Sequence, residues 1–279
     1  MVSPEAELLS RNHQAAQDRN AAVVVAGVIR LWQALVRTDD LDGSAMRWIE
    51  RIIPTIRTRY RESARLALAY IQVYRRLELG ADDPGPTIQL PELPEEAVRT
   101  SLRVTGPVAL KQKFRAAEVD RARARRLDVP EQPFSLQKAM DDAAREAAGA
   151  ALRHTFAGGR EVGMRHVAAD RVALGWARQT KARPCYFCAM LASRGAVFKD
   201  DSFDESNARF VGEGDYKAHD HCRCTLRPVY RREDAMDSDA QVFEDIWARS
   251  TRGTGGRDAI NAFRRAYEAE YGGRDTTTR

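Results

Sequence analysis

Apolar residues recur every three or four positions along most of the chain, which is the spacing that places side chains on one face of an α-helix. The clearest stripe falls in the segment that follows residue 44 and consists of Met46, Ile49, Ile53, Ile56, Tyr60, Ala67, Tyr70 and Tyr74. Similar spacing predicts helices from residue 4 to about 38, from 95 to 126, from 135 to 156 and in the tail from 238 to 271. The pattern therefore indicates a chain built mainly of helices.

Glycine and proline mark the expected interruptions of these helices. Residues 80–94 hold four prolines and two glycines and predict a linker or long loop. Pro54 predicts a kink or a break, and Gly106–Pro107 predicts an interruption. The Gly158–Gly159 pair predicts a helix end, with a separate short helix over residues 161–169.

Two short segments depart from the helical pattern. Residues 171–180 carry Val172, Leu174 and Trp176 at every second position, which indicates a strand. Residues 224–230 form a second strand candidate, which Pro228 would confine to a sheet edge or a strand end. We therefore expect an α+β, predominantly α-helical fold, divided into a helical region (1–130), a small α+β Cys/His module (131–232) and a helical tail (233–279).

Composition excludes several classes of protein. The chain has 279 residues, 30% of them charged, and its longest nearly uninterrupted apolar run spans only residues 21–29. A membrane-spanning helix needs about 20 apolar residues, and the N-terminus has no apolar core of a secretory signal. We therefore expect no membrane partner and a cytosol-like compartment.

The net charge of +5 is modest, but one helix concentrates cations. Residues 111–126 hold seven basic and two acidic side chains, which is compatible either with a solvated helix face or with contact to phosphates or an acidic partner. No platform of several aromatic side chains interleaves the basic ones, which disfavours single-strand or sequence-specific nucleic-acid binding. The candidate contacts to DNA or a partner are Lys111, Lys113, Arg121, Arg125, Arg223 and Arg227.

All four cysteines lie within 40 residues of one another. They form a C-x-x-C pair, Cys185 and Cys188, and a second group in which Cys222 and Cys224 follow His219. Zinc prefers four thiolate or imidazole ligands in a tetrahedron, and paired ligand spacings of this kind are typical of zinc sites. The sequence therefore predicts a structural zinc site.

The ligand set is open at this stage. Either the four cysteines bind the metal, or His219 replaces Cys224. Buried thiols without metal, and a disulfide or redox role, are the alternatives. If zinc is structural, the substitution Cys185→Ser is expected to unfold a module spanning about residues 155–232, because metal binding supplies folding free energy.

Enzymatic interpretations find little support in the sequence. The C-x-x-C pair lacks the upstream H-x-E of zinc deaminases. The Asp220–His221 pair is typical of HNH-type nucleases, but no further metal-binding His or Asn follows the expected hairpin. No G-x-S-x-G segment marks a serine nucleophile. We expect no enzymatic activity, with a metal-dependent nuclease or a protease as the alternative.

Two segments resemble a known family. Residues 173–195 and 219–230 are similar to the phage Mu F-like minor head proteins, or head morphogenesis proteins, especially those from phages of actinobacteria. The shared pattern is C-x-x-C, a glycine, then H-x-x-C-R-C before a strand, here Cys185, Cys188, Gly195, His219, Cys222, Arg223 and Cys224. The resemblance covers about residues 155–271. The family often has H-P-N-C-R-C, whereas this chain has an additional imidazole, His221, which leaves the ligand set in doubt.

The resemblance implies a minor capsid protein that associates with the portal protein, or with capsid or scaffold subunits, during head assembly. It implies a place inside the virion or near the portal, after assembly in the host cytoplasm, where the protein would aid DNA packaging or ejection beside packaged double-stranded DNA. A DNA-binding packaging module is an alternative. Some similar proteins are described as capsid maturation proteases, which is a further alternative. No small-molecule substrate is expected.

Overall fold

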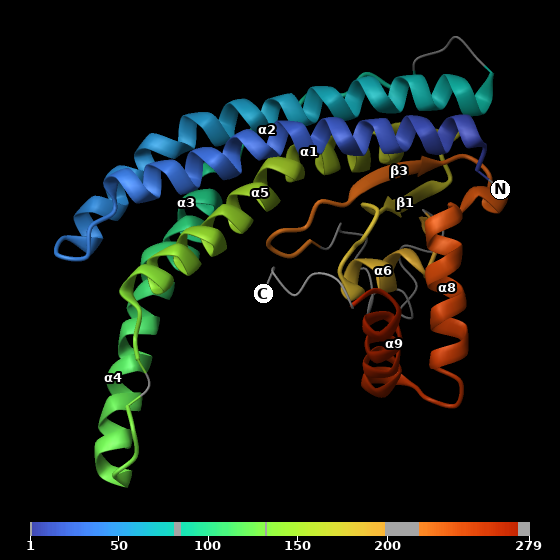
Figure 1. The fold of residues 1–279 in the computed structure, drawn as a ribbon. Helices are drawn as coiled ribbons and strands as arrows, with labels where there is room; N and C mark the ends of the chain where they lie inside the picture. Colours follow the sequence, from blue (N-terminus) through green and yellow to red (C-terminus); the bar gives the residue numbers. More distant parts are fainter. Residues whose placement is uncertain (1, 81–84, 132, 199–217, 273–279) are drawn as a thin grey trace.

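Three long helices form the body of the protein in the computed structural model, which describes residues 2–80, 85–131, 133–198 and 218–272. Helices α1 (Pro4–Leu35), α2 (Leu41–Leu79) and α5 (Leu136–Ala169) pack against one another along most of their length (Figure 1). Each begins at a side-chain cap: Ser3, Asp40 and Ser135 accept hydrogen bonds from backbone N–H groups three residues on.

The first apolar core lies between these helices at the end where α1 turns into α2. Trp32 and Trp48 meet edge to face with ring centroids 5.0 Å apart, surrounded by Ile52, Ile56 and a run of buried alanines on α5. The small alanine side chains allow the helix axes to approach closely. The predicted stripe of α2 is confirmed in large part, although Met46 is exposed.

Two predicted helix ends do not occur. Helix α2 continues through Pro54, so Pro54 does not mark a break. Helix α5 continues through Gly158–Gly159, so the prediction of a separate helix at 161–169 was wrong. The reason is tertiary: a Cβ at Gly158 would collide with the carbonyl oxygen of Tyr60, so these glycines allow α5 to approach α2 and do not end a helix. Gly106–Pro107 does perturb its helix, as a π-helical turn (Val104–Val108) between α3 (Glu95–Arg103) and α4 (Ala109–Leu127).

A small antiparallel sheet lies against α2 and α5. Its strands are β1 (Gly175–Gln179), β2 (Ala196–Phe198) and β3 (Thr225–Val229) in the order β2-β1-β3, with Gly175 opposite Val229. Both predicted strands are confirmed, and Pro228 lies on an edge strand as expected. Residues 196–218 are rich in Asp, Ser and Gly, a composition that predicts a surface loop. Their first three residues instead form β2, and residues 199–217 lie outside the described residues.

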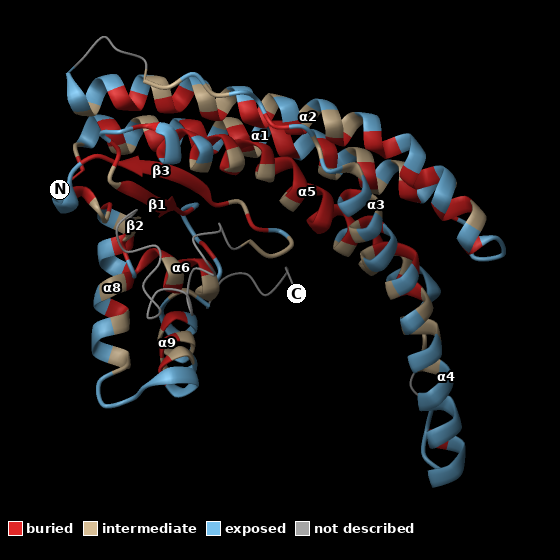
Figure 2. Cartoon of the chain, turned by 180° about the vertical axis from the view of Figure 1, so that it is seen from behind, coloured by how far each residue is buried: buried red, intermediate tan, exposed pale blue. Residues whose placement is uncertain are grey.

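Two further apolar cores hold the remaining elements. Tyr70, Tyr74, Val162 and Leu226 join the sheet to α2 and α5. A third core packs α6 (Tyr186–Ala192) against α8 (Ser238–Ser250) and α9 (Gly256–Tyr271). Figure 2 shows buried positions concentrated where these layers meet. The structure confirms the predominantly helical α+β class, while the predicted domain boundaries stay a prediction.

The described linker residues 85–94 form neither helix nor strand, in agreement with the prediction for that part of the segment. Within the described parts of the chain, no helix combines the length and apolar character needed to cross a membrane.

Candidate metal centre

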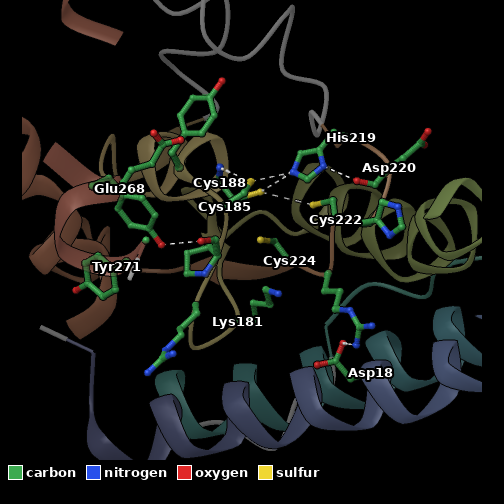
Figure 3. A pocket seen from close by; sticks show the side chains of 17 residues that line it. Asp18, Lys181, Cys185, Cys188, His219, Asp220, Cys222, Cys224, Glu268 and Tyr271 are labelled. Atoms are coloured by element: carbon green, nitrogen blue, oxygen red, sulfur yellow. Dashed lines mark hydrogen bonds and ion pairs between the residues drawn. The ribbon is translucent and has the colours of Figure 1, made fainter. Parts of the chain in front are cut away.

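Cysteine and histidine side chains from two distant segments meet beside the sheet. Cys185 caps the N-terminus of α6, and its sulfur accepts a hydrogen bond from the backbone N–H of Cys188 at 3.5 Å. His219 and Cys222 lie on the segment that leads into β3, and Cys224 directly precedes that strand. Figure 3 shows the side chains of both segments pointing toward one another. The fold thus brings together the five residues that the sequence singled out.

Cys188 is the centre of the cluster. One group of donors, Cys185, Cys188 and His219, lies within 4.8 Å, and a second, Cys188, Cys222 and Cys224, lies within the same limit. The Cys188 sulfur is 3.7 Å from the Cys222 sulfur and 3.6 Å from Nε2 of His219. Two ligands of one tetrahedral zinc ion are about 3.5–3.8 Å apart, given Zn–N and Zn–S bonds of about 2.0 and 2.3 Å. The cluster could therefore hold a metal ion such as zinc.

The ring of His219 is oriented for metal binding. Its Nδ1 lies 2.5 Å from the backbone oxygen of Asp220 and donates to it, which leaves Nε2 directed at the sulfurs of Cys185, at 3.0 Å, and Cys188. A carbonyl that holds the outer nitrogen of a histidine in this way fixes the tautomer whose other nitrogen carries the lone pair. The donor set therefore fits a metal without a change of the His219 ring orientation.

His221, the imidazole by which the sequence departs from the family pattern, lies elsewhere. Its backbone adopts a left-handed conformation with φ of 64°, and its N–H donates to the carbonyl of Gly149 on α5 at 3.2 Å. Its ring lies where a Cβ on Gly149 would be, and it does not join either group of donors. The extra imidazole thus docks the segment onto α5.

Hydrogen bonding within the cluster separates the pKa values of its members. The pKa of Cys185 is lowered to about 4, mainly by a hydrogen bond from Cys188, whose own pKa is raised because it donates. The pKa of Cys222 is lowered, mainly by hydrogen bonds with Cys188 and Cys224. The pKa of His219 is raised to about 9, mainly by its hydrogen bond to Cys185. A bound metal would replace the protons shared in this network.

Two buried arginines, Arg160 and Arg178, lie close to the sulfurs of the cluster. Arg160 on α5, only 4% exposed, donates to the carbonyls of Cys222 at 2.8 Å and Cys224 at 3.0 Å and approaches the Cys222 sulfur at 3.4 Å. Arg178 on β1 lies 3.9 Å from the Cys188 sulfur. Buried charges require opposite charges nearby, and a metal bound by three or four thiolates carries a net negative charge. The cationic wall thus complements a metal–thiolate centre.

The other face of the cluster opens to a hollow of about 820 Å³. Cys185, His219 and Tyr271 line it, together with charged side chains such as Lys181 and Asp18 (Figure 3). Cys188, Cys222 and Cys224 are buried, whereas Cys185 is exposed and His219 is half-buried. A metal would therefore reach the cluster from the side of Cys185 and His219.

Comparison with protein-family models shows the family of the chain. The family model described as VG15 protein matches residues 5–250, which is most of the chain. The chain belongs to the VG15 protein family. No curated protein and no solved structure matches it. The family assignment covers α1 through α8 and therefore includes every residue of the metal centre.

In this VG15 family member, α1 contacts the segment that carries His219, Cys222 and Cys224, here called the ligand segment (residues 218–224). The sequence did not reveal this contact. Gln14 is buried, donates to the carbonyl of Arg223 and accepts from the hydroxyl of Thr225 at 3.1 Å. Arg160 was missed for the same reason, since both are polar residues on helices assigned to the core. One sequence feature could have indicated this contact: α1 carries a row of polar residues at helical spacing on the face that is buried, among them Gln14, Gln17 and Asn20.

The predicted DNA or partner contacts are arranged differently from the expectation. Arg227 is 1% exposed and donates to Tyr74 and to the carbonyl of Asp234, so its assignment as a contact residue was wrong. Arg223 lies 3.4 Å from Asp18 of α1. The cations of α4 project with their helix, far from the metal centre (Figure 1), so the structure does not bring the two groups of candidate residues together.

Proposed function

We propose that this protein is a minor capsid, or head morphogenesis, protein of a tailed phage, whose small sheet module is held by a structural zinc ion. The observation that carries the proposal is the convergence of Cys185, Cys188, His219, Cys222 and Cys224 on one centre, because these residues also carry the Mu F-like resemblance. Gly195, the glycine of that pattern, lies three residues after the end of α6 and has φ of +75°, a conformation that favours glycine.

A structural role for the metal is supported by the number and kind of donors. Two groups of three sulfur or imidazole donors share Cys188, so the cluster offers five donors, more than a closed tetrahedral shell needs, and closed shells are typical of structural zinc. Zinc held there would tie the start of α6 to the segment before β3 and would supply folding free energy. We propose that the protein acts by binding other head proteins and not as an enzyme.

The ligand set can be measured directly. We expect one zinc per chain by elemental mass spectrometry of the purified full chain, and loss of that zinc in Cys188→Ser and Cys222→Ser. His219→Gln and Cys224→Ser distinguish the two candidate sets, since only the true ligand should abolish metal binding. His221→Gln is the matched control and should retain zinc. Wild-type protein without zinc, even after refolding with it, would refute the metal proposal.

The proposed place in the virion has its own test. We expect quantitative mass spectrometry of purified phage particles to find peptides from both halves of the chain at a few to some tens of copies per particle. We propose the capsid interior or the portal vicinity as its location, with portal, capsid or scaffold subunits as partners near packaged DNA. Absence from mature particles and from assembly intermediates would contradict this function.

A further inference from the structure

Helix α4 leaves the body of the protein as an arm (the arm is Ala109–Leu127 throughout). Figures 1 and 2 show it projecting away from both the helical body and the sheet module, with mostly exposed residues. Only Leu110 and Ala124 of the arm are buried. Phe114 packs against Phe134, with ring centroids 5.8 Å apart, on the segment that returns to α5. One side of the arm therefore contacts its own chain and the opposite side faces solvent.

The solvent side of the arm carries an ordered row of side chains. Arg115, Val119 and Arg123 are each four residues apart and Arg126 follows three residues later, so they share one helix face, which we call the arginine face. Val119 lies nine residues, or two and a half turns, from the buried Leu110, which places it on the opposite side of the helix. Its side chain is 66% exposed.

The other cations of the arm already have partners in this chain. Lys111 pairs with Asp42 at 2.6 Å, Lys113 with Glu146 at 3.0 Å and Arg125 with Glu131 at 3.1 Å. Arg121 lies over the ring of Phe134, 6.0 Å from its centroid. Among the described residues, none of the three arginines of the arginine face makes an ion pair within 4.0 Å. The arm thus carries two groups of cations: one group contacts the rest of this chain, and the arginines of the arginine face remain available to a partner.

The composition of this face indicates the chemistry of its occupant. A phosphate backbone is bound by positive charge alone, and exposed apolar side chains would add nothing to such a contact. Here Val119 lies between two arginines, and Leu127, 58% exposed, continues the face at the tip. Arginine is enriched where proteins meet, and exposed apolar side chains such as Val119 and Leu127 gain free energy when a partner surface removes them from water. The face therefore fits an acidic protein surface with an apolar centre better than it fits DNA.

We propose that the arginine face of the arm docks onto an acidic protein surface with an apolar centre, and that this surface belongs to a portal or capsid subunit. The choice of partner rests on the proposed function. Arg115, Arg123 and Arg126 would pair with acidic residues at the rim, while Val119 and Leu127 would cover the apolar centre.

The experiment measures binding of the purified full chain to the portal protein and to the major capsid protein of the source phage, by biolayer interferometry in 150 mM NaCl. A 30-base-pair DNA duplex is the third probe. The first variant is Arg115→Gln, Arg123→Gln and Arg126→Gln combined, which keeps good helix formers. Its matched control removes the same charge from exposed positions of α1 and α2: Arg19→Gln, Arg30→Gln and Arg51→Gln. Circular dichroism verifies that all variants keep the helical content of the wild type.

A second variant, Val119→Lys, separates protein docking from nucleic-acid binding, since it removes the apolar side chain and adds a positive charge. We expect the arm triple variant to weaken binding to one head protein at least 10-fold and Val119→Lys to weaken it at least 5-fold. The control triple variant should stay within 2-fold.

Three outcomes would overturn the inference. Binding of a head protein that is unchanged in both arm variants would remove the arm from the interface and leave the proposed function standing. Binding of neither head protein by the wild type would count against both. DNA binding that is lost in the triple variant, kept in Val119→Lys and about 25-fold weaker at 500 mM NaCl, as three phosphate contacts predict, would make the arm a nucleic-acid contact.

Discussion

At the scale of single residues, the candidate centre depends on buried polar side chains that belong to other elements. Arg160 reaches from α5 to the carbonyls of Cys222 and Cys224 and to a sulfur. Gln14 of α1 donates to the carbonyl of Arg223, which lies between those two cysteines. These contacts satisfy the backbone of a ligand segment that forms no regular structure before β3. They fix where the sulfurs lie before any metal binds.

Removing Arg160 should therefore weaken metal binding without touching a ligand. We expect Arg160→Met to lower zinc affinity about 10–100-fold, as loss of an outer-shell partner commonly does, measured by competition with a chromophoric chelator. Arg165→Met, on the same helix and exposed, is the control and should change affinity less than 2-fold. Equal affinities in the two variants would show that the buried guanidinium does not support the site.

A second residue-scale prediction concerns His13 and pH. His13 is 7% exposed, stacks on Tyr70 with ring centroids 4.3 Å apart, and has a pKa lowered to about 4 by burial. The unfolded chain binds a proton on this histidine near pH 6.5, whereas the folded chain does not until about pH 4. The free energy of unfolding is therefore not reduced by His13 above pH 6.5. It falls as the pH decreases from 6.5 toward 4, by up to about 3 kcal/mol.

The measurement compares urea unfolding of the wild type and His13→Phe at pH 7 and pH 4.5. Phenylalanine keeps an aromatic ring against Tyr70 but does not titrate, so the variant should lose less stability between the two pH values. Parallel losses in both proteins would assign the acid sensitivity to other groups, such as the ligands of the metal centre.

At the scale of elements, the close approach of α5 to α2 decides the shape of the body. Gly158 lies against the carbonyl of Tyr60, and the N–H of Gly159 donates to the hydroxyl of Ser63 at 3.1 Å. Any side chain at Gly158 would have to push the two backbones apart. From the sequence, the same glycine pair predicted a helix end. The sequence alone does not distinguish a glycine that ends a helix from a glycine that allows another helix to pack closely.

The substitution Gly158→Ala tests this packing. Alanine favours helix intrinsically over glycine by about 1 kcal/mol, yet we expect a net loss of about 2–3 kcal/mol in the free energy of unfolding because of overpacking against Tyr60. Gly255→Ala is the control, since a Cβ there meets nothing within 4 Å. Chemical denaturation monitored by circular dichroism gives both values. A stabilised Gly158→Ala variant would mean that the helices separate easily.

At the scale of the whole molecule, the metal centre lies between two apolar cores. One core joins the sheet to α2 and α5, and the other joins α6 to α8 and α9. Tyr267 of α9 donates to the carbonyl of Pro184, directly before the C-x-x-C pair, at 2.6 Å. Residues 155–169 are the last part of α5, which packs against α1 and α2 in the long helical body. Metal loss should therefore act locally.

Hydrogen exchange before and after removal of zinc by a chelator measures this directly. We expect exchange to rise at least 10-fold in α6, residues 218–224 and α9, and to change less than 2-fold in α1 and α2, which have their own core. Cys185→Ser should give the same pattern. A uniform rise across the chain would mean that the centre supports the entire fold.

The sequence by itself determined the helical character of the chain, the two strands of the central pairing and the donors of the candidate site. Helical and strand periodicity is local, and ligand types at close spacing are visible without a fold. Only the tertiary structure decided that α5 runs unbroken past Gly158–Gly159, that Arg160 and Gln14 support the ligand segment, and that Arg227 is buried while Arg115, Arg123 and Arg126 are exposed. These facts depend on which surfaces meet, and contacts between residues 62 to 209 positions apart leave no periodic signal in either segment.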